Sequence, residues 1–251
     1  MKTIVIGDIH GRNIWKDIVA QEQADRVIFI GDYFDSFNIG STEQQFNFKE
    51  IIEFKEKDEC EVILLIGNHD YHYYPGGETY SGYQHGAAPA IRQLLQENKH
   101  HLQMCYQLDN ILFTHAGIGW DWLSYQNRYE PGVDSEAIAD FVNAIWEYQP
   151  NRFMFYGIDP YGNSKTQTPI WIRPQALIAG NRDTFLKEEY IQVVGHTQMK
   201  KIDIKGKATG GRYYFIDTLD TSTQFLIYEN GEFKVGEVEV LPDDFHETKV
   251  L

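Results

Sequence analysis

Short apolar runs that end in a glycine and a polar residue recur along the first third of the chain. The runs TIVI, RVIFI and EVILLI contain almost only Ile, Val, Leu and Phe, without polar alternation. Such runs are typical of strands buried on both faces, and they predict strands over residues 2–6, 26–30 and 61–66. Helices are predicted between them over residues 13–20, capped by Asn13, and 43–57, which follows Ser41 and Thr42. Alternating strands and helices favour a parallel sheet covered by helices.

The pattern changes after residue 86, where strands become more frequent than helices. Helices are predicted from just after Gly86 to about residue 98 and over 134–146. Strands are predicted over 103–108 and 111–114, joined in a hairpin at Asp109 and Asn110. Five further strands are predicted over residues 191–194, 200–204, 212–216, 223–228 and 232–237. Asn230-Gly231 is the strongest hairpin signal in the chain. The segments 71–86 and 151–169 are predicted to be long loops, which are usually functional or mobile.

Composition narrows the class of protein. The 251 residues carry a formal net charge of −15, so non-specific nucleic-acid binding is not expected. Cys60 and Cys105 stand in no paired motif, which argues against a disulfide framework and a thiolate zinc site. No apolar stretch approaches the roughly 20 residues that cross a bilayer. The N-terminal sequence resembles a strand more than a signal peptide. With no paired cysteines, a reducing compartment, most simply the cytoplasm, is predicted, and no membrane partner is expected.

Candidate metal ligands stand at the ends of five predicted strands. The blocks are GDIHG (7–11), GDYFD (31–35), GNHD (67–70), THAG (114–117) and GHT (195–197). In open α/β sheets, ligands bind outside the carboxyl ends of the strands, so these blocks are expected to converge. Asp, Asn and His together offer oxygen and nitrogen ligands, which suit manganese, iron or zinc better than calcium. Because blocks occur in both halves of the chain, one domain over residues 1–251 is predicted.

The order of these blocks resembles that of the calcineurin-like metallophosphoesterases, and the likeness covers most of the chain. The resemblance implies an α/β fold with a two-sheet β-sandwich flanked by helices, in four layers α/β/β/α. It also implies a centre of two metal ions, with Mn²⁺ preferred and iron or zinc as alternatives. Matched motif by motif, the implied ligands are Asp8, His10 and Asp32 for the first metal, and Asp32 as a bridge with Asn68, His115 and His196 for the second. The resemblance further implies that His69 protonates the leaving alkoxide and that Asp35 orients His69.

Two departures from the family pattern bear on the substrate. Many phosphodiesterases of the family carry GHxH, whereas this chain has GHTQ with Gln198 at the last position. This feature, THAGI and WIRP (171–174) resemble the subset of Ser/Thr protein phosphatases and symmetrical diadenosine tetraphosphate hydrolases. That subset often has Arg-Gly after the second block, but here Ser36-Phe37 follow. Arg173, or less preferably Arg12, is therefore expected to contact the phosphate, since a guanidinium suits phosphate geometry.

The predicted activity is hydrolysis of a phosphate ester by a hydroxide held between two metals. A phosphomonoesterase of the Ser/Thr protein phosphatase type is preferred, with a phosphoprotein as substrate. The alternatives are a hydrolase of dinucleoside polyphosphates or cyclic nucleotides and, less favoured, a non-catalytic binding protein on the same fold. A dinucleotide-binding dehydrogenase is disfavoured because GDIHGR lacks the GxGxxG spacing. His72 and His85 are expected to be solvated, and the tyrosines of segment 71–86 to pack within that loop.

Overall fold

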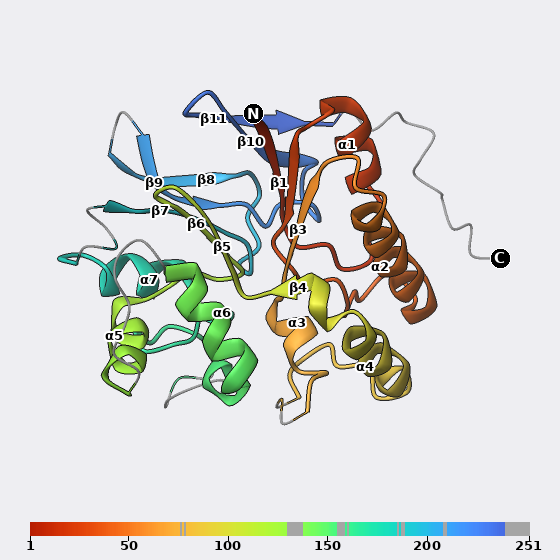
Figure 1. Cartoon of the computed structure of the whole chain (residues 1–251), viewed down its shortest axis with the longest axis horizontal. Coiled ribbons are helices and arrows are strands. Elements are labelled where there is room, and N and C mark those ends of the chain that lie inside the picture. The colour runs from red at the N-terminus through yellow and green to blue at the C-terminus, as the bar shows by residue number, and fades with distance from the viewer. Residues whose placement is uncertain are drawn as a thin grey trace.

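The strands of the computed structural model form two mixed sheets (Figure 1). The structure describes residues 1–75, 77, 79–129, 138–154, 159, 161–184, 186, 189–207 and 210–238. The first sheet has the order β11-β10-β1-β2-β3-β4 and the second has the order β5-β6-β7-β9-β8. The strands are β1 Lys2–Ile6, β2 Arg26–Phe29, β3 Glu61–Leu65, β4 Leu102–Gln103, β5 Cys105–Leu108, β6 Ile111–Thr114, β7 Ile191–Val194, β8 Asp203–Lys207, β9 Gly210–Phe215, β10 Gln224–Glu229 and β11 Glu232–Glu237.

Each sheet has a parallel centre, and the parallel pairing of β1, β2 and β3 confirms the prediction from the apolar runs. β1, β2, β3 and β4 are parallel in the first sheet, and β6, β7 and β9 are parallel in the second. β10 runs antiparallel to β1 and pairs with β11 through the predicted Asn230-Gly231 turn. Both turn residues have positive φ, 53° and 83°, as a two-residue hairpin turn requires. The loops that follow the parallel strands of each sheet therefore leave from one edge.

Alternating side chains along the strands build the layers. Ile4 and Ile6 of β1 face a core shared with helices, whereas Val5 faces the space between the two sheets. In the second sheet, Tyr214 lies between the sheets while Phe215 packs in a separate cluster with Leu177 of α7. This period of two is what a pleated strand dictates. The result is two sheets packed face to face with helices outside them, the four-layer α/β/β/α sandwich expected of the family.

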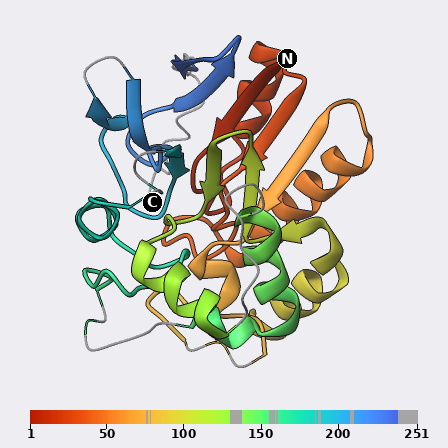
Figure 2. The ribbon, with the colours of Figure 1, turned by 60° about the vertical axis from the view of Figure 1, so that its left-hand side comes forward.

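The helices lie on the outer sides of this sandwich. α1 (Trp15–Glu22), α2 (Ser41–Glu56) and α4 (Ala88–Glu97) appear at the right of Figure 1. Figure 2 brings α5 (Trp120–Tyr129) and α6 (Ile138–Tyr148), coloured green, to the front. The remaining helices are α3 (Asn68–Tyr71), α7 (Pro174–Gly180) and the 3₁₀ turns Lys99–His101 and Pro150–Phe153. In the part of the chain that the structure describes, no helix has the length and apolar character that a membrane span needs.

Several sequence predictions needed correction. Helix α1 starts at Trp15 and its N-cap is Ile14, not Asn13, so no side chain caps it. The predicted strand 103–108 is divided at Met104, with β4 in the first sheet and β5 in the second. The strand expected at 200–204 runs from Asp203 to Lys207. Helices α3, α5 and α7 were not predicted, and the start of the predicted helix 134–146 lies outside the described residues.

Candidate metal centre

One half of the predicted ligand set gathers around the amide of Asn68. The ring nitrogens His115 Nε2 and His196 Nδ1 each lie 2.9 Å from Asn68 Oδ1. His115 Nε2 is also 3.4 Å from Asp32 Oδ2. These four side chains come from the ends of β2, β3, β6 and β7, so both sheets contribute to one site.

Asp32 also faces the remaining predicted ligands. His10 Nε2 lies 3.7 Å from Asp32 Oδ2. Asp8 accepts hydrogen bonds from the backbone N–H of His196, at 3.0 and 3.1 Å from its two oxygens. Asp8, Asp32 and His115 offer ligand atoms within 4.8 Å of one another, and all three are buried. The six side chains therefore converge, with Asp32 between the two groups, as a bridging carboxylate would be.

The hydrogen bonds of the three histidines fit a metal site. His10 Nδ1 and His115 Nδ1 lie 2.5 and 3.0 Å from the carbonyl oxygens of Phe34 and Ile30. His196 Nε2 lies 3.2 Å from the carbonyl oxygen of Trp171. A carbonyl only accepts, so these nitrogens carry the protons and the opposite ring nitrogens present lone pairs to Asp32 and Asn68. Metal-ligating histidines commonly donate their other ring N–H to a carbonyl in this way. A cation bound between the imidazole nitrogens and the oxygens of Asp32 and Asn68 would relieve the repulsion between their lone pairs.

The backbone is strained at four of the block residues. His10, Asp32, Asp35 and His196 have φ between 42° and 65°, a region that few residues other than glycine adopt. At Gly195, a Cβ would lie 2.0 Å from Asp8 Oδ1, so only glycine allows this carboxylate to approach. Strain of this kind clusters at functional sites, where the surrounding structure holds it in place.

Asp70 holds two of the strand-end turns together. Its Oδ2 accepts the N–H groups of Asp32 and Gly67, at 2.8 and 2.9 Å, and its Oδ1 accepts that of Tyr33 at 2.8 Å. The side chain is fully buried. The turns after β2 and β3 are thereby fixed relative to each other. Asp70 is the last residue of the GNHD block, and nothing in its local sequence indicates this role.

The electrostatics of the centre are those of a crowded anionic site. Burial, together with Asp217 and Asp32, raises the pKa of Asp8 well above its usual value. Burial would also raise the pKa of Asp32, but His115 and His69 hold it well below the usual range. Burial and the nearby Arg173 guanidinium lower the pKa of His196, which favours the neutral imidazole that a metal requires. Bound cations would offset the repulsion among the carboxylates.

His69 sits beside this centre and is tied to Asp35. His69 Nδ1 is 2.9 Å from Asp35 Oδ2. Burial would lower the pKa of His69, but the carboxylates of Asp32 and Asp35 outweigh it and raise that pKa. Asp35 also accepts from the hydroxyl of Tyr73, at 2.5 Å, and from Gln84 Nε2, at 3.2 Å. Asp35 is thus a fixed, charged acceptor for the His69 ring.

The expectation that His72 is solvated was wrong. His72 is only 1% exposed, and its Nε2 lies 2.6 Å from the same oxygen of Asp35 that contacts His69. Its Nδ1 accepts the N–H of Tyr80 at 3.4 Å. Asp35, His69 and His72 form a second group of closely spaced potential metal ligands. His72 is buried because segment 71–86 folds back over Asp35, which no local pattern predicts. His85, by contrast, is exposed as expected.

Two adjoining cavities of about 290 and 180 Å³ open onto the centre, and both are lined by His10, His69, Arg173, His196 and Asp217. Arg173 donates to the carbonyl oxygen of His196 and to Thr197 Oγ1, at 3.2 and 3.1 Å. Arg12 lines only the larger of the two and forms an ion pair with Asp220. Of the two arginines, only Arg173 therefore lines the smaller cavity, which contains the predicted ligands Asp8, Asp32 and Asn68. Phe37 also lines the larger of the two cavities and is 81% exposed.

Asp217 is a member of the site that the sequence analysis missed. Burial and the neighbouring Asp32 raise the pKa of its carboxyl group to about 6. The sequence did contain a signal for Asp217. This residue directly follows the predicted strand 212–216, just as the ligand blocks follow the other strands. Asp217 lacks the neighbouring glycine and histidine that made the five blocks conspicuous.

Comparison with known proteins places this geometry in a family. A cold-active protein-tyrosine phosphatase of a psychrophilic Shewanella species has 17% identity and a TM-score of 0.63, over 94% of this chain and 77% of that one. A metallophosphoesterase from Sphaerobacter thermophilus has 13% identity and a TM-score of 0.51, over 95% and 89% of the two chains. These likenesses concern the fold. No curated protein matches the chain. The model of the calcineurin-like phosphoesterases matches residues 1–199, and the chain therefore belongs to the calcineurin-like phosphoesterase family, whose members are metal-dependent hydrolases of phosphate esters.

Proposed function

We propose that this phosphoesterase is a phosphomonoesterase of the Ser/Thr protein phosphatase type. The observation that carries the proposal is the convergence of Asp8, His10, Asp32, Asn68, His115 and His196 beside His69 and Arg173. In this proposal Asp8, His10 and Asp32 hold one metal ion, and Asp32, Asn68, His115 and His196 hold the other. Two such ions would bind the phosphoryl oxygens and activate a water for in-line attack.

The proposed general acid is His69. Its Nδ1 proton is committed to Asp35, which leaves Nε2–H free to protonate the leaving oxygen. The raised pKa favours the protonated imidazole that a general acid needs. Arg173 lies on both cavities and offers a guanidinium to the phosphate. The described hydrogen bonds of the His69 side chain use Nδ1, and those of the Arg173 side chain use Nε and Nη1. His69 Nε2 and Arg173 Nη2 are therefore available to the substrate.

The charge around the cavities supports a monoester over a polyphosphate. Among the residues that the structure describes, Arg12 and Arg173 are the only cationic side chains other than histidine on the two cavities, and Arg12 is already paired with Asp220. A phosphate monoester needs few cationic contacts beyond the metals. A dinucleoside polyphosphate extends several more negative charges, for which the two cavities offer few cationic side chains.

A nucleotide substrate is the second candidate because of Phe37. Its exposed ring stands on the cavity beside His69, where the leaving group of a substrate would lie. Aromatic rings stack on nucleobases irrespective of sequence. If the leaving group is a nucleoside, Phe37→Ala raises KM for nucleotides, whereas Phe46→Ala, which removes an exposed ring on α2, has no effect.

A substrate panel tests the proposal. The protein is loaded with Mn²⁺ and assayed on phosphoserine, phosphothreonine and phosphotyrosine peptides, diadenosine tetraphosphate, a cyclic nucleotide and an aryl phosphodiester. The proposal expects kcat/KM for at least one phosphopeptide to exceed that for the nucleotides and the diester by at least about tenfold, or about 1.4 kcal/mol. A preference of that size for diadenosine tetraphosphate would replace the proposal with its rival. His69→Asn serves as the inactive control.

A further inference from the structure

Asp217 lies at the same edge of the sandwich as the predicted ligands. Ile216 N–H donates to the carbonyl oxygen of Val194 at 2.8 Å, so the chain after β9 continues beside β7 up to this edge. At Gly7, an added Cβ would lie 2.3 Å from the carbonyl oxygen of Ile216 and 3.3 Å from the Cα of Asp217. The end of β9 therefore abuts the turn that carries Asp8.

The carboxyl group of Asp217 is buried but has no partner of its own. Asp217 is only 8% exposed and lines both cavities of the centre. Its backbone carbonyl accepts the N–H of Met199 at 2.8 Å, but its carboxylate takes part in no hydrogen bond or ion pair with any residue that the structure describes. Burying a carboxylate without a donor or counter-ion is costly, so a natural explanation is a cation bound in the cavity.

Asp220, three residues after Asp217, has a carboxylate that is more exposed and has partners. The Asp220 side chain is 42% exposed and is paired with the Arg12 guanidinium. Its Oδ2 also accepts Gln198 Nε2 at 2.7 Å. Gln198, at the position of the second histidine in GHxH, is thus turned toward Asp220. Gln198 and Asp220 line only the larger of the two cavities, whereas Asp217 lines both.

We propose that Asp217 is a further carboxylate ligand of the metal position assigned to Asp8, His10 and Asp32. This inference rests on the proposed metal roles of those three residues. In GHxH relatives an imidazole adds to that position, and here a carboxylate from a different strand takes its place. The position then has three carboxylates and one imidazole, whereas the other has one carboxylate, one amide and two imidazoles. Oxygen-rich positions favour Mn²⁺ over softer ions, so the two positions differ in metal preference.

Metal binding to the metal-free protein tests this directly. Mn²⁺ is titrated by calorimetry at pH 7.5 into the wild type, Asp217→Asn, Asp220→Asn and Asp8→Asn. We expect Asp217→Asn and Asp8→Asn to weaken the same one of two sites, Asp217→Asn by at least about tenfold, as expected for lost groups around a metal. Asp220→Asn should leave both affinities within about twofold of the wild type. Wild-type affinities at both sites in Asp217→Asn would overturn the inference.

Thermal melting distinguishes a metal-ligand role of Asp217 from a purely structural role. Without metal, Asp217→Asn should melt at or above the temperature of the wild type, because it removes repulsion from Asp8 and Asp32. With saturating Mn²⁺, the gain in Tm should be smaller in this variant than in the wild type. A metal-free variant that melts lower but gains as much from Mn²⁺ would mean a structural role and would overturn the inference. Asp217→Ser repeats the test if the Asn variant does not fold.

The outcomes also separate this inference from the proposed function. A wild type that binds two Mn²⁺ ions but hydrolyses no phosphate ester contradicts the proposed function and leaves the titration of Asp217→Asn interpretable. A wild type that binds no Mn²⁺ contradicts both. Full binding by Asp217→Asn, with normal hydrolysis, contradicts the role of Asp217 alone.

Discussion

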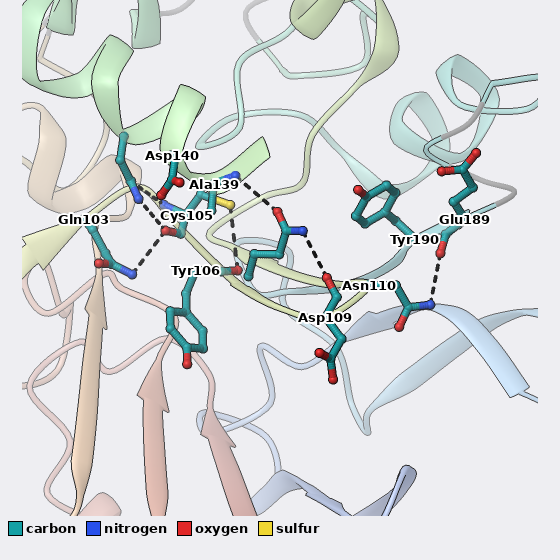
Figure 3. A pocket seen from close by; sticks show the side chains of 11 residues that line it. Gln103, Cys105, Tyr106, Asp109, Asn110, Ala139, Asp140, Glu189 and Tyr190 are labelled. Atoms are coloured by element: carbon teal, nitrogen blue, oxygen red, sulfur yellow. Dashed lines mark hydrogen bonds between the residues drawn. The ribbon is translucent and has the colours of Figure 1, made fainter. Parts of the chain in front are cut away.

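The described part of the chain has cavities in two separate regions, and the larger of these cavities is not at the metal centre. A cavity of about 800 Å³ lies between α6 and the β5–β6 turn and is lined largely by polar side chains (Figure 3). The two cavities at the metal centre have volumes of only about 290 and 180 Å³. Volume alone would therefore direct attention to the wrong face of the protein.

The amide side chains that line the large cavity already have partners in the backbone. Asn143 Oδ1 accepts the N–H groups of Met104 and Cys105, both at 3.0 Å, and its Nδ2 donates to the carbonyl oxygen of Cys105 at 2.8 Å. Asn110 Nδ2 donates to the carbonyl oxygen of Glu189 at 3.0 Å, which Figure 3 shows as a dashed line. Burial raises the pKa of the Cys105 thiol, so Cys105 is not a thiolate nucleophile.

The metal centre differs because buried ionisable groups face one another there. Asp8, Asp32 and Asp217 repel one another, and imidazole lone pairs point at Asp32 and Asn68. A polar group that supports the fold is satisfied within the protein, whereas a group that binds a ligand is left available. Buried charge without a partner therefore identifies this site better than cavity size does.

The largest effect should come from Asp32→Asn. This change removes the charge from the carboxylate that faces both halves of the ligand set, and we expect kcat/KM to fall by at least about 10³-fold. The assay is hydrolysis of an aryl phosphate with Mn²⁺. Asp140→Asn, in the large cavity, is the matched control and should stay within about twofold of the wild type. Equal losses in the two variants would remove the distinction between the cavities.

His69→Asn should lower kcat by about 10²-fold or more, as expected for the loss of a general acid. The loss should be larger for an alkyl phosphate than for an aryl phosphate, because a poor leaving group needs the proton more. The measurement is kcat for a series of phosphate esters with alcohols of increasing pKa. A loss that is the same for every ester would contradict the acid role of His69.

Asp35→Asn should change the pH dependence of hydrolysis. Asp32 and Asp35 raise the pKa of His69, so the protonated acid persists to higher pH in the wild type. Without the charge of Asp35 that pKa falls, and activity should be lost on the alkaline side at a lower pH than in the wild type. The pH profile of kcat from pH 5 to 10 checks this. An unmoved alkaline limb, with the fold intact, would show that Asp35 does not set the proton affinity of His69.

His72→Ala should have a smaller effect, of about three- to tenfold on kcat, because His72 acts through Asp35 and does not reach the substrate. KM should change little. His72→Asn, which keeps a donor near Asp35, should recover part of the loss. The same loss in both variants, or a change confined to KM, would contradict a positioning role for His72.

Asn143→Ala should leave kcat/KM unchanged and lower only stability. It removes the side-chain acceptor of two backbone N–H groups of the β4–β5 segment, at a cost of about 1–3 kcal/mol in the free energy of unfolding. Denaturant unfolding measures this cost, and the aryl phosphate assay measures activity. A loss of activity at unchanged stability would show that the large cavity takes part in function.

The sequence predicted much of the fold because the relevant signals are local. Continuous apolar runs mark strands buried on both faces, and the parallel order of β1, β2 and β3 follows from strand–helix alternation. Block residues such as Asp8, Asp32 and His196 were found because each directly follows a strand. Parallel strands deliver their ends to one edge of a sheet, so convergence was predictable before any coordinate was known.

What the sequence did not reveal depends on contacts between distant segments. The division of residues 103–108 between two sheets is a choice of neighbour, and both β4 and β5 satisfy the same local preference. His72 is buried by a loop that folds over Asp35. The contacts that hold this loop join distant positions, since the hydroxyl of Tyr73, 38 residues along the chain from Asp35, donates to the Asp35 carboxylate.

The chain by itself thus determined which side chains end its strands and hence the candidate ligands and the family. Only the tertiary structure decided that Asp217 lacks a partner while Asp220 has one, and that His72 and Asp70 support the site. Strand propensity acts over a few consecutive residues, whereas the burial and pairing of a charge depend on every segment packed around it.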